Sequence, residues 1–244
     1  MTKTECGQVK FGATLIDYRI VRSKRRRKTV EITLDPYEGV LVSAPVDTDA
    51  VELEGIVRKR APWIARKTSE GALQSRRKNF VSGESLPYLG RQVRLFVELA
   101  DVRRVKIDFE HWNFNVTAPF QMEGLERRDA IEAAFRRWYR QRAEGLLPSR
   151  VERWSSRLGV TASNVLARDQ RQRWASCSAD GTLRFNWRTV MVAPTLIDYV
   201  IVHELVHLTA RNHSPDFWQQ VAAILPDFKI RRVRLKEAGW ELTL

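Results

Sequence analysis

The fold is decided by Val202-His203-Glu204-Leu205-Val206-His207-Leu208, together with His213 in Arg211-Asn212-His213-Ser214-Pro215. If the first stretch is helical, His203 and His207 lie one turn apart on one face, so both imidazoles can reach one metal ion. Glu204 lies beside them, where its carboxylate can accept a proton from metal-bound water without being a ligand. This spacing is typical of zinc-dependent hydrolases.

Three observations favour a metal site over a purely structural cluster of histidines. The flanking residues are apolar, and unpartnered imidazoles and a carboxylate would be costly to bury among them. Three of the four histidines of the chain fall between His203 and His213. Ser214-Pro215-Asp216 is a helix-start signal, and the positive end of that helix keeps the His213 ring neutral for coordination. The sequence therefore predicts that His203, His207 and His213 bind Zn²⁺.

The composition is that of a globular protein with one or two domains, since 43% of its 244 residues are hydrophobic. An excess of 42 basic over 29 acidic residues favours a polyanionic neighbour, such as nucleic acid, an acidic substrate or a phosphate-bearing ligand. The alternative is a well-solvated basic surface, and the same two interpretations apply to the basic run 22–28. Two cysteines, no apolar leader and no membrane-length apolar run predict a cytoplasmic protein that does not enter a membrane.

Hydrophobic periodicity predicts an α+β protein. Alternating residues predict strands over 14–44 and 86–116, with a helix following Asp47-Thr48-Asp49. Helical periodicity runs from Gly124 to Gly159, and Pro148 is expected to break or restart that helix. No internal repeat is evident. We expect a β-rich N-terminal domain over residues 1–123 and a helical domain with a small sheet over residues 124–244.

A hairpin is predicted just before the histidine-bearing helix. Asp180-Gly181 is a strong turn signal ahead of the alternating residues 183–189, and Pro194 then opens the helix. The hairpin could offer unpaired backbone groups to an extended peptide, or it could simply pack within a sheet. The residues predicted to contact substrate are Trp174, Ser176, Cys177, Arg184 and Asn186.

Several motifs of the chain resemble the YgjP-like metallopeptidase domain family, which is related to the SprT and WLM zinc proteases and more distantly to the M48 peptidases. The resemblance covers nearly the full length. In the front half it rests on residues 21–30, 61–64 and 83–90, and in the back half on Arg173-Trp174-Ala175-Ser176-Cys177-Ser178, residues 181–187, residues 198–208 and Asn212-His213-Ser214-Pro215-Asp216-Phe217-Trp218. Ala175 stands where the family usually has glycine.

This resemblance implies a zincin-like metallopeptidase domain of the SprT or minigluzincin type. By the same resemblance, His203, His207 and His213 are the zinc ligands, and Glu204 is the catalytic acid and base. The SprT-like relatives cut proteins attached to DNA, which would suit the positive charge of this chain. A uridine triphosphate pyrophosphatase activity has also been attributed to a member of the YgjP-like group.

Three functions follow as hypotheses. The first is a zinc metallopeptidase (EC 3.4.24-like), in which Glu204 assists attack by zinc-bound water and then protonates the leaving amine. Its candidates for stabilising the oxyanion are Tyr199, Arg184 and Arg188. The second is a metal-dependent nucleoside triphosphate pyrophosphatase, although no glycine-rich phosphate loop is present. The third is a nucleic-acid-associated module with structural zinc, for which Cys177 is the one thiol close in sequence.

Overall fold

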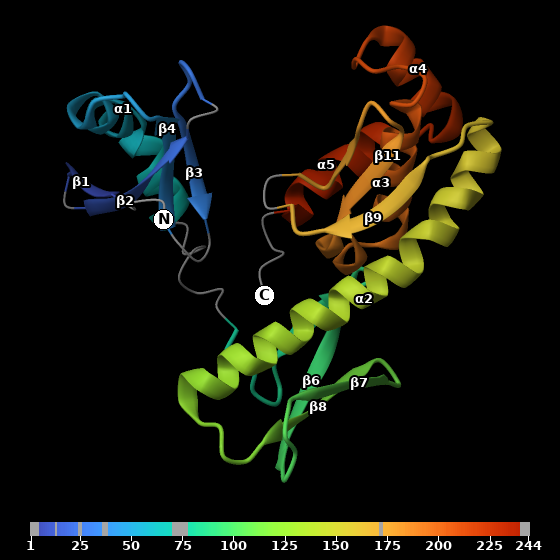
Figure 1. The fold of residues 1–244 in the computed structure, drawn as a ribbon, viewed down its shortest axis with the longest axis horizontal. Helices are drawn as coiled ribbons and strands as arrows, with labels where there is room; N and C mark the ends of the chain where they lie inside the picture. The colour runs from blue at the N-terminus through green and yellow to red at the C-terminus, as the bar shows by residue number, and fades with distance from the viewer. Residues whose placement is uncertain are drawn as a thin grey trace. The chain divides into compact units, whose positions relative to one another are not determined.

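The computed structural model describes residues 5–12, 14–23, 26–35, 39–69, 78–170 and 173–239. These residues form a mixed α and β protein with three sheets and five α-helices (Figure 1), in agreement with the expected α+β class. The chain divides into two compact units, Met1–Arg77 and Lys78–Leu242.

The first unit is a four-stranded sheet covered by one helix. Strands β1 (Glu5–Phe11), β2 (Thr14–Ser23), β3 (Glu31–Asp35) and β4 (Gly39–Pro45) lie in the order β1-β2-β4-β3, and helix α1 (Ala50–Ser69) follows. Alternation along the strands directs one row of apolar side chains toward the buried residues of α1. The predicted hairpin is confirmed by antiparallel pairing of β3 with β4, while residues 36–38 of its turn lie outside the described residues.

The second unit begins with another four-stranded sheet. Strands β5 (Ser85–Tyr88), β6 (Arg91–Ala100), β7 (Lys106–Glu110) and β8 (Asn113–Pro119) lie in the order β5-β6-β8-β7. Helix α2 (Gly124–Leu158) covers it, with ring centroids 5.1 Å apart for Phe114 and Phe135 and 4.9 Å apart for Phe114 and Trp138. The chain therefore does not divide at the expected boundary between residues 123 and 124. A division there would separate the apolar face of this sheet from α2, the helix that covers it.

The two units contain the same ββββα arrangement, although the sequence suggested no repeat. In each sheet the first two strands pair antiparallel, the second and fourth pair parallel, and the third and fourth pair antiparallel. The fourth strands end alike, in Val42-Ser43-Ala44-Pro45 and in Val116-Thr117-Ala118-Pro119, and a helix follows each. The repeat escapes sequence inspection because a topology constrains only the alternation of apolar residues, which many sequences satisfy.

Helix α2 is continuous through Pro148, so the expected break is wrong. Proline removes one backbone hydrogen bond, but Leu147 and Val151 on either side of the predicted break are both buried and pack into the core. The helix ends as expected at Gly159, whose φ of 65° is the left-handed conformation that glycine adopts most easily.

The remaining elements complete the second unit around the buried helix α3. They are β9 (Asn164–Arg168), β10 (Ala175–Cys177), β11 (Thr182–Asn186), the 3₁₀ helix η1 (Trp187–Met191), α3 (Pro194–Val206), α4 (Pro215–Ile224) and α5 (Phe228–Gly239). The strands lie in the order β10-β11-β9. Figure 1 shows α2 running past β6 and β8 at one end and past β9 at the other, so it joins the two sheets of the unit.

The turn between β5 and β6 fixes the start of α3. The N–H groups of Leu89 and Gly90 donate to the carbonyl oxygens of Val190 and Met191 at 2.8 and 3.0 Å. Gly90 has a φ of +78°, and a Cβ atom there would lie 2.7 Å from the Cα of Ala193. Only glycine fits this contact without displacement of the backbone.

Among the described residues, no helix is both long and apolar enough to cross a bilayer.

Candidate metal centre

The first two histidines lie at the end of α3. The helix ends at Val206, and His207 is its C-cap, with helical dihedrals of φ −63° and ψ −17°. His203 and His207 therefore keep their one-turn separation, and their ring centroids are 4.9 Å apart. The core around α3 is apolar because Val200, Ile201 and Leu205 are buried, as the sequence predicted.

The third histidine reaches the same point from the loop before α4. Ser214 caps α4 by accepting a hydrogen bond from the backbone N–H of Phe217, which is the predicted helix start. The Nε2 atom of His213 lies 3.0 Å from the Nε2 atom of His203. One nitrogen from each of the three rings lies within 4.8 Å of the others, so the three side chains could hold a metal ion.

Two aromatic residues of α4 support the imidazoles. Phe217 is fully buried, and its ring centroid is 4.9, 4.6 and 4.8 Å from those of His203, His207 and His213. Trp218 stacks on His213 at 5.6 Å with an interplanar angle of 23°. The sequence named both residues only within the motif of residues 212–218, without a role at the metal site. Phe217 contacts all three histidines and Trp218 contacts His203 and His213, and these contacts come from the packing of α4 against α3.

Two of the three rings, those of His203 and His207, are held in the neutral form that binds metals. Burial lowers the pKa of His203 to about 3, with further lowering by His207 and His213, and burial also lowers the pKa of His207. The Nδ1 atom of His207 lies 3.1 Å from the carbonyl oxygen of Ala210, which places the ring proton there and leaves the Nε2 lone pair free. Among the described residues, the buried Nδ1 atom of His203 has no hydrogen-bond partner. A metal cation is the group to which the convergent nitrogen lone pairs of the three rings would donate.

Glu204 is a buried carboxyl group next to the histidines. Its side chain is only 6% exposed, and burial raises its pKa to about 7, against the opposing effects of Arg173 and of a hydrogen bond from the backbone N–H of Cys177. That hydrogen bond ties Glu204 on α3 to strand β10. A carboxyl group with a pKa near neutrality can both accept and return a proton.

Strand β10 forms an edge of its sheet beside Glu204. The N–H of Asn186 donates to the carbonyl oxygen of Trp174, and the N–H of Ser178 donates to the carbonyl oxygen of Thr182. The backbone N–H and C=O groups at the even-numbered positions along β10 therefore point toward β11. By alternation, Ala175 and Cys177 direct their backbone groups away from β11. The N–H of Cys177 already meets Glu204, which leaves the N–H and C=O of Ala175 and the C=O of Cys177 toward the outer edge.

The predicted substrate-contacting residues do not all lie on one face of the sheet. Register and alternation put Trp174, Ser176, Arg184 and Asn186 on one face of the sheet and Cys177 on the other. Asn186 is buried, and its amide donates to the carbonyl oxygens of Gln170 and Arg173. The pKa of the Cys177 thiol is raised by burial and then by the carboxyl group of Glu204.

The three candidates for stabilising an oxyanion are also separated by the fold. Arg188 pairs with Asp169 at 2.6 Å and stacks over Trp187 at 4.1 Å, and Arg184 donates to the hydroxyl of Ser178 at 2.7 Å. Tyr199 lies one turn before His203 on α3, and the two ring centroids are 6.0 Å apart. Of the three, only Tyr199 contacts the histidine cluster.

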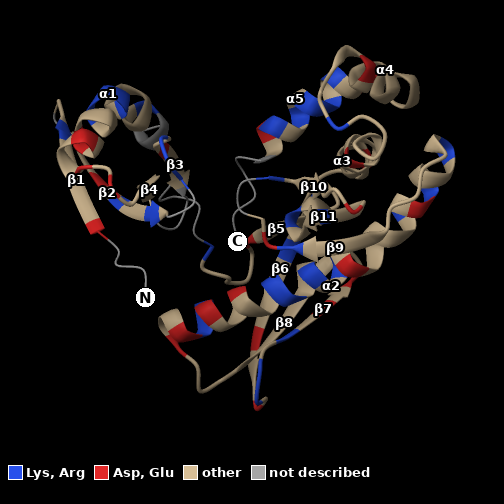
Figure 2. Cartoon of the chain, turned by 45° about the horizontal axis from the view of Figure 1, so that its top comes forward, with Lys and Arg blue, Asp and Glu red and all other residues tan. Residues whose placement is uncertain are grey.

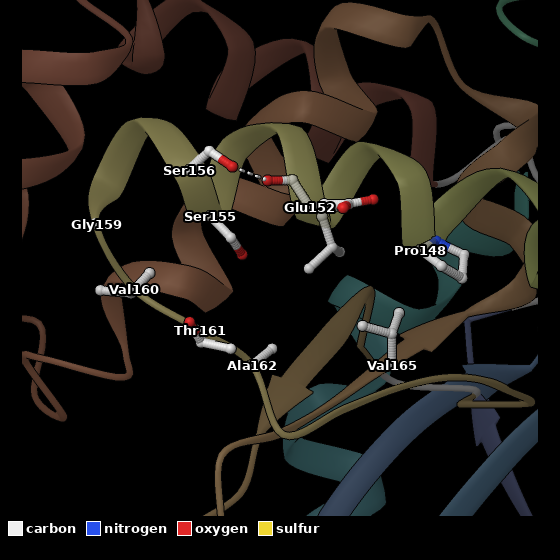
Figure 3. Close-up of a pocket in the computed structure, with 10 residues that line it drawn as sticks. Pro148, Glu152, Ser155, Ser156, Gly159, Val160, Thr161, Ala162 and Val165 are labelled. Carbon is white, nitrogen blue, oxygen red and sulfur yellow. Dashed lines mark hydrogen bonds between the residues drawn. The ribbon is translucent and has the colours of Figure 1, made fainter.

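A cavity of about 400 Å³ lies elsewhere in the same unit. It opens between the last turns of α2 and the segment 159–165, and its lining includes Val151, Ser155 and Val165 (Figure 3). The Ser155 hydroxyl points into the opening without a hydrogen-bond partner among the described residues. No histidine lines this cavity, so it is not part of the candidate metal centre.

The family of the chain follows from comparison with known proteins. The model of the YgjP-like metallopeptidase domain matches residues 28–238, a span that includes the histidine cluster and most of both units. The chain belongs to the YgjP-like family. Family membership identifies the protein as a metallopeptidase, and the histidine cluster is the place where the described residues could hold its metal ion.

Two solved structures are similar to part of the chain. The metallopeptidase zymogen of Pyrococcus abyssi abylysin is 24% identical, with a TM-score of 0.36, over 38% of this chain and 94% of its own. The metallopeptidase zymogen of Methanocaldococcus jannaschii jannalysin is 23% identical, with a TM-score of 0.35, over 38% of this chain and 95% of its own. No curated protein matches the chain.

Proposed function

We propose that this YgjP-like protein is a zinc-dependent peptidase with a zincin-like site, in which His203, His207 and His213 bind Zn²⁺ and Glu204 is the general base and acid. The observation that carries this proposal is the convergence of three imidazoles beside a buried glutamate. Its substrate would be a protein or peptide, in keeping with the peptidase family.

The donor set fits zinc. Zn–N bonds of about 2.0–2.1 Å in a tetrahedral site put the ligand nitrogens about 3.3 Å apart. The Nε2 atoms of His203 and His213 are separated by 3.0 Å, and all three donors lie within 4.8 Å of one another. Neutral imidazoles suit Zn²⁺ better than the hard cations Mg²⁺ and Ca²⁺, which prefer oxygen. Three protein ligands with one open position are typical of a catalytic zinc site, whereas structural sites use four.

Zinc held by these residues would act as a Lewis acid that polarises a carbonyl group and acidifies water. Glu204 takes a proton from the attacking water on its carboxylate oxygen and later transfers it to the nitrogen of the departing amine. A hydrogen bond from the N–H of Cys177 would help to orient the carboxylate for these transfers. Tyr199, whose ring centroid lies 6.0 Å from that of His203, remains the candidate to donate a hydrogen bond to the substrate oxygen.

The outer edge of β10 would hold the substrate in an extended form. An added strand could exchange hydrogen bonds with the N–H and C=O of Ala175, which face away from β11. This would place the backbone of the peptide alongside the strand that anchors Glu204.

The test is the substitution Glu204→Gln, which keeps the size and the oxygen acceptor of the side chain but removes its proton chemistry. We expect bound zinc, measured by mass spectrometry of the metal, to be unchanged, and hydrolysis of an unstructured protein to fall by a factor of about 10²–10⁴ or more. Glu152→Gln on the exposed side of α2 is the matched control and should leave both quantities unchanged. Turnover that survives Glu204→Gln would overturn the proposal.

No specific observation favours the pyrophosphatase or nucleic-acid alternatives. Figure 2 shows basic and acidic residues interspersed along α2, where Glu132 pairs with Arg128 and Arg136, and Glu144 pairs with Arg140. In the basic run 22–28, Arg22 pairs with Glu5 and Arg26 with Glu31, while Lys24 and Arg25 lie outside the described residues.

A further inference from the structure

We propose that Arg232, together with Arg173, selects peptides that carry acidic side chains close to the scissile bond. The inference rests on the proposed peptidase function and names the substrate class of the same site. The two arginines come from different elements, Arg232 from α5 and Arg173 from the segment just before β10.

Arg232 is held at the wall of the metal centre by an aromatic contact. Its guanidinium carbon lies 5.2 Å from the ring centroid of Trp218, and Trp218 in turn lies 5.8 Å from His203 and 5.6 Å from His213. Stacking on an indole restricts the long side chain while its charge stays exposed to solvent. In agreement with this position, the charge of Arg232 lowers the pKa values of both His203 and Tyr199.

Arg173 lies on the other functional element of the site. Its backbone carbonyl accepts a hydrogen bond from Asn186 at 3.3 Å, which fixes the chain immediately before β10, and its side chain is exposed. The charge of Arg173 acts on Glu204, where it opposes the increase in pKa caused by burial. Because Arg173 comes only two residues before β10 begins at Ala175, a peptide lying along β10 would pass close to it.

Among the described residues, these two arginines have no ion-pair partner, whereas two other arginines close to them do. On α5, Arg231 pairs with Asp227 at 2.9 Å, and beyond β11, Arg188 pairs with Asp169 at 2.6 Å. Among the described residues, neither Arg173 nor Arg232 lies within ion-pairing distance of a carboxylate. Figure 2 shows basic residues repeated along α5.

Arg232 has no carboxylate partner among the described residues, and a Zn²⁺ ion held by the three histidines would repel both guanidinium groups, so an anion that joins the site would be favourable. A carboxylate on the substrate supplies that anion, and a guanidinium can bind it through two parallel hydrogen bonds. Because successive side chains of an extended peptide alternate, an acidic residue on either side of the scissile bond can reach one of the two arginines without displacing the backbone from β10.

Binding can be measured separately from catalysis in the zinc-loaded Glu204→Gln chain. The probes are two short fluorescent peptides of the same neutral sequence, with Glu or Gln at the positions flanking the central bond. We expect the Glu peptide to bind about tenfold more tightly in low salt, with the difference shrinking as salt screens the charges. Arg232→Gln, and separately Arg173→Gln, should reduce this preference to about threefold or less.

The matched control is Arg234→Gln, which removes the same charge from the same helix about 200° around its axis. This variant should keep the tenfold preference. Arg232→Glu provides a second test, because reversing the charge should favour a peptide with Lys at the flanking positions over the Glu peptide. Circular dichroism spectra of all variants should match that of the parent chain, since the altered side chains are exposed.

Equal binding of the Glu and Gln peptides by the parent chain would overturn the inference, and so would an equal loss in Arg232→Gln and Arg234→Gln. Neither result affects the proposed function, which fails only if the wild-type chain does not cleave a neutral unstructured protein or if Glu204→Gln still does.

Discussion

Phe217 is expected to control metal affinity although it cannot bind a metal. Its buried ring lies within 4.9 Å, centroid to centroid, of each histidine ring in the cluster. Phe217→Leu keeps the site apolar but removes the flat surface against which all three imidazoles pack. The rings would then sample orientations that do not point to one position, and zinc would have to order them when it binds.

The magnitude follows from two separate effects. A Phe-to-Leu change in a packed core costs about 1–1.5 kcal/mol, which lowers the melting temperature of a unit of this size by about 3–6 °C. Loss of the packing that orients metal ligands typically weakens metal binding about 10–100-fold. The second effect should appear in Phe217→Leu in addition to the first.

The control is Phe114→Leu in the same unit. Phe114 is equally buried, but it packs against Phe135 and Trp138 under the β5–β8 sheet. Both variants should lose similar stability when melted without metal, whereas competition titration with a zinc-binding dye should show weaker affinity only for Phe217→Leu. Equal zinc affinities in the two variants, at equal loss of stability, would refute the reasoning.

Three further predictions concern stability and titration. Removing zinc with a chelator should lower the melting temperature by about 5–10 °C relative to protein at a hundredfold excess over the Kd, where binding adds about 2.7 kcal/mol; His203→Ala should show no such difference in the same thermal scan. Gly90→Ala should destabilise the second unit by about 2 kcal/mol or more in urea unfolding, because its φ is +78° and its Cβ would meet the backbone at the start of α3. Asp180 has its pKa lowered to about 2, first by the hydroxyl of Ser178, so it stabilises the fold above its unfolded value of about 3.9 and loses that contribution as the pH falls toward 2. Ser178→Ala should raise the midpoint of Asp180 in a carboxyl NMR titration, and an unchanged midpoint would show that the hydroxyl is not the main cause.

Local patterns predicted the elements that present the histidines. Pro194 begins α3, Ser214 caps α4 and Gly159 ends α2, as expected from the sequence. Each signal acts within one turn of the chain, through a backbone group that the local residue satisfies or a conformation that it permits. The predicted hairpin of β10 and β11 formed for the same reason.

Patterns of longer range were less informative. The sequence indicated a break at Pro148, but burial on both sides of that proline keeps α2 continuous. It also grouped β5–β8 with the first unit, because neither strand alternation nor helical periodicity reports which helix covers which sheet. Asn186 was expected to contact substrate, yet the fold uses its amide to fix two backbone carbonyls.

The sequence by itself determined the chemistry available to this protein: two imidazoles one turn apart, a third at the mouth of the next helix, and a glutamate between them. Those relations depend on helix geometry and capping, which operate over a few residues. Only the tertiary structure decided that Phe217 supports all three rings, that β10 meets Glu204 through the N–H of Cys177, and that Arg232 reaches the site from α5. These contacts join residues on different elements, and they arise from the packing of buried apolar faces. An apolar face can pack against many other apolar faces, so its partner is fixed only when the whole core is assembled.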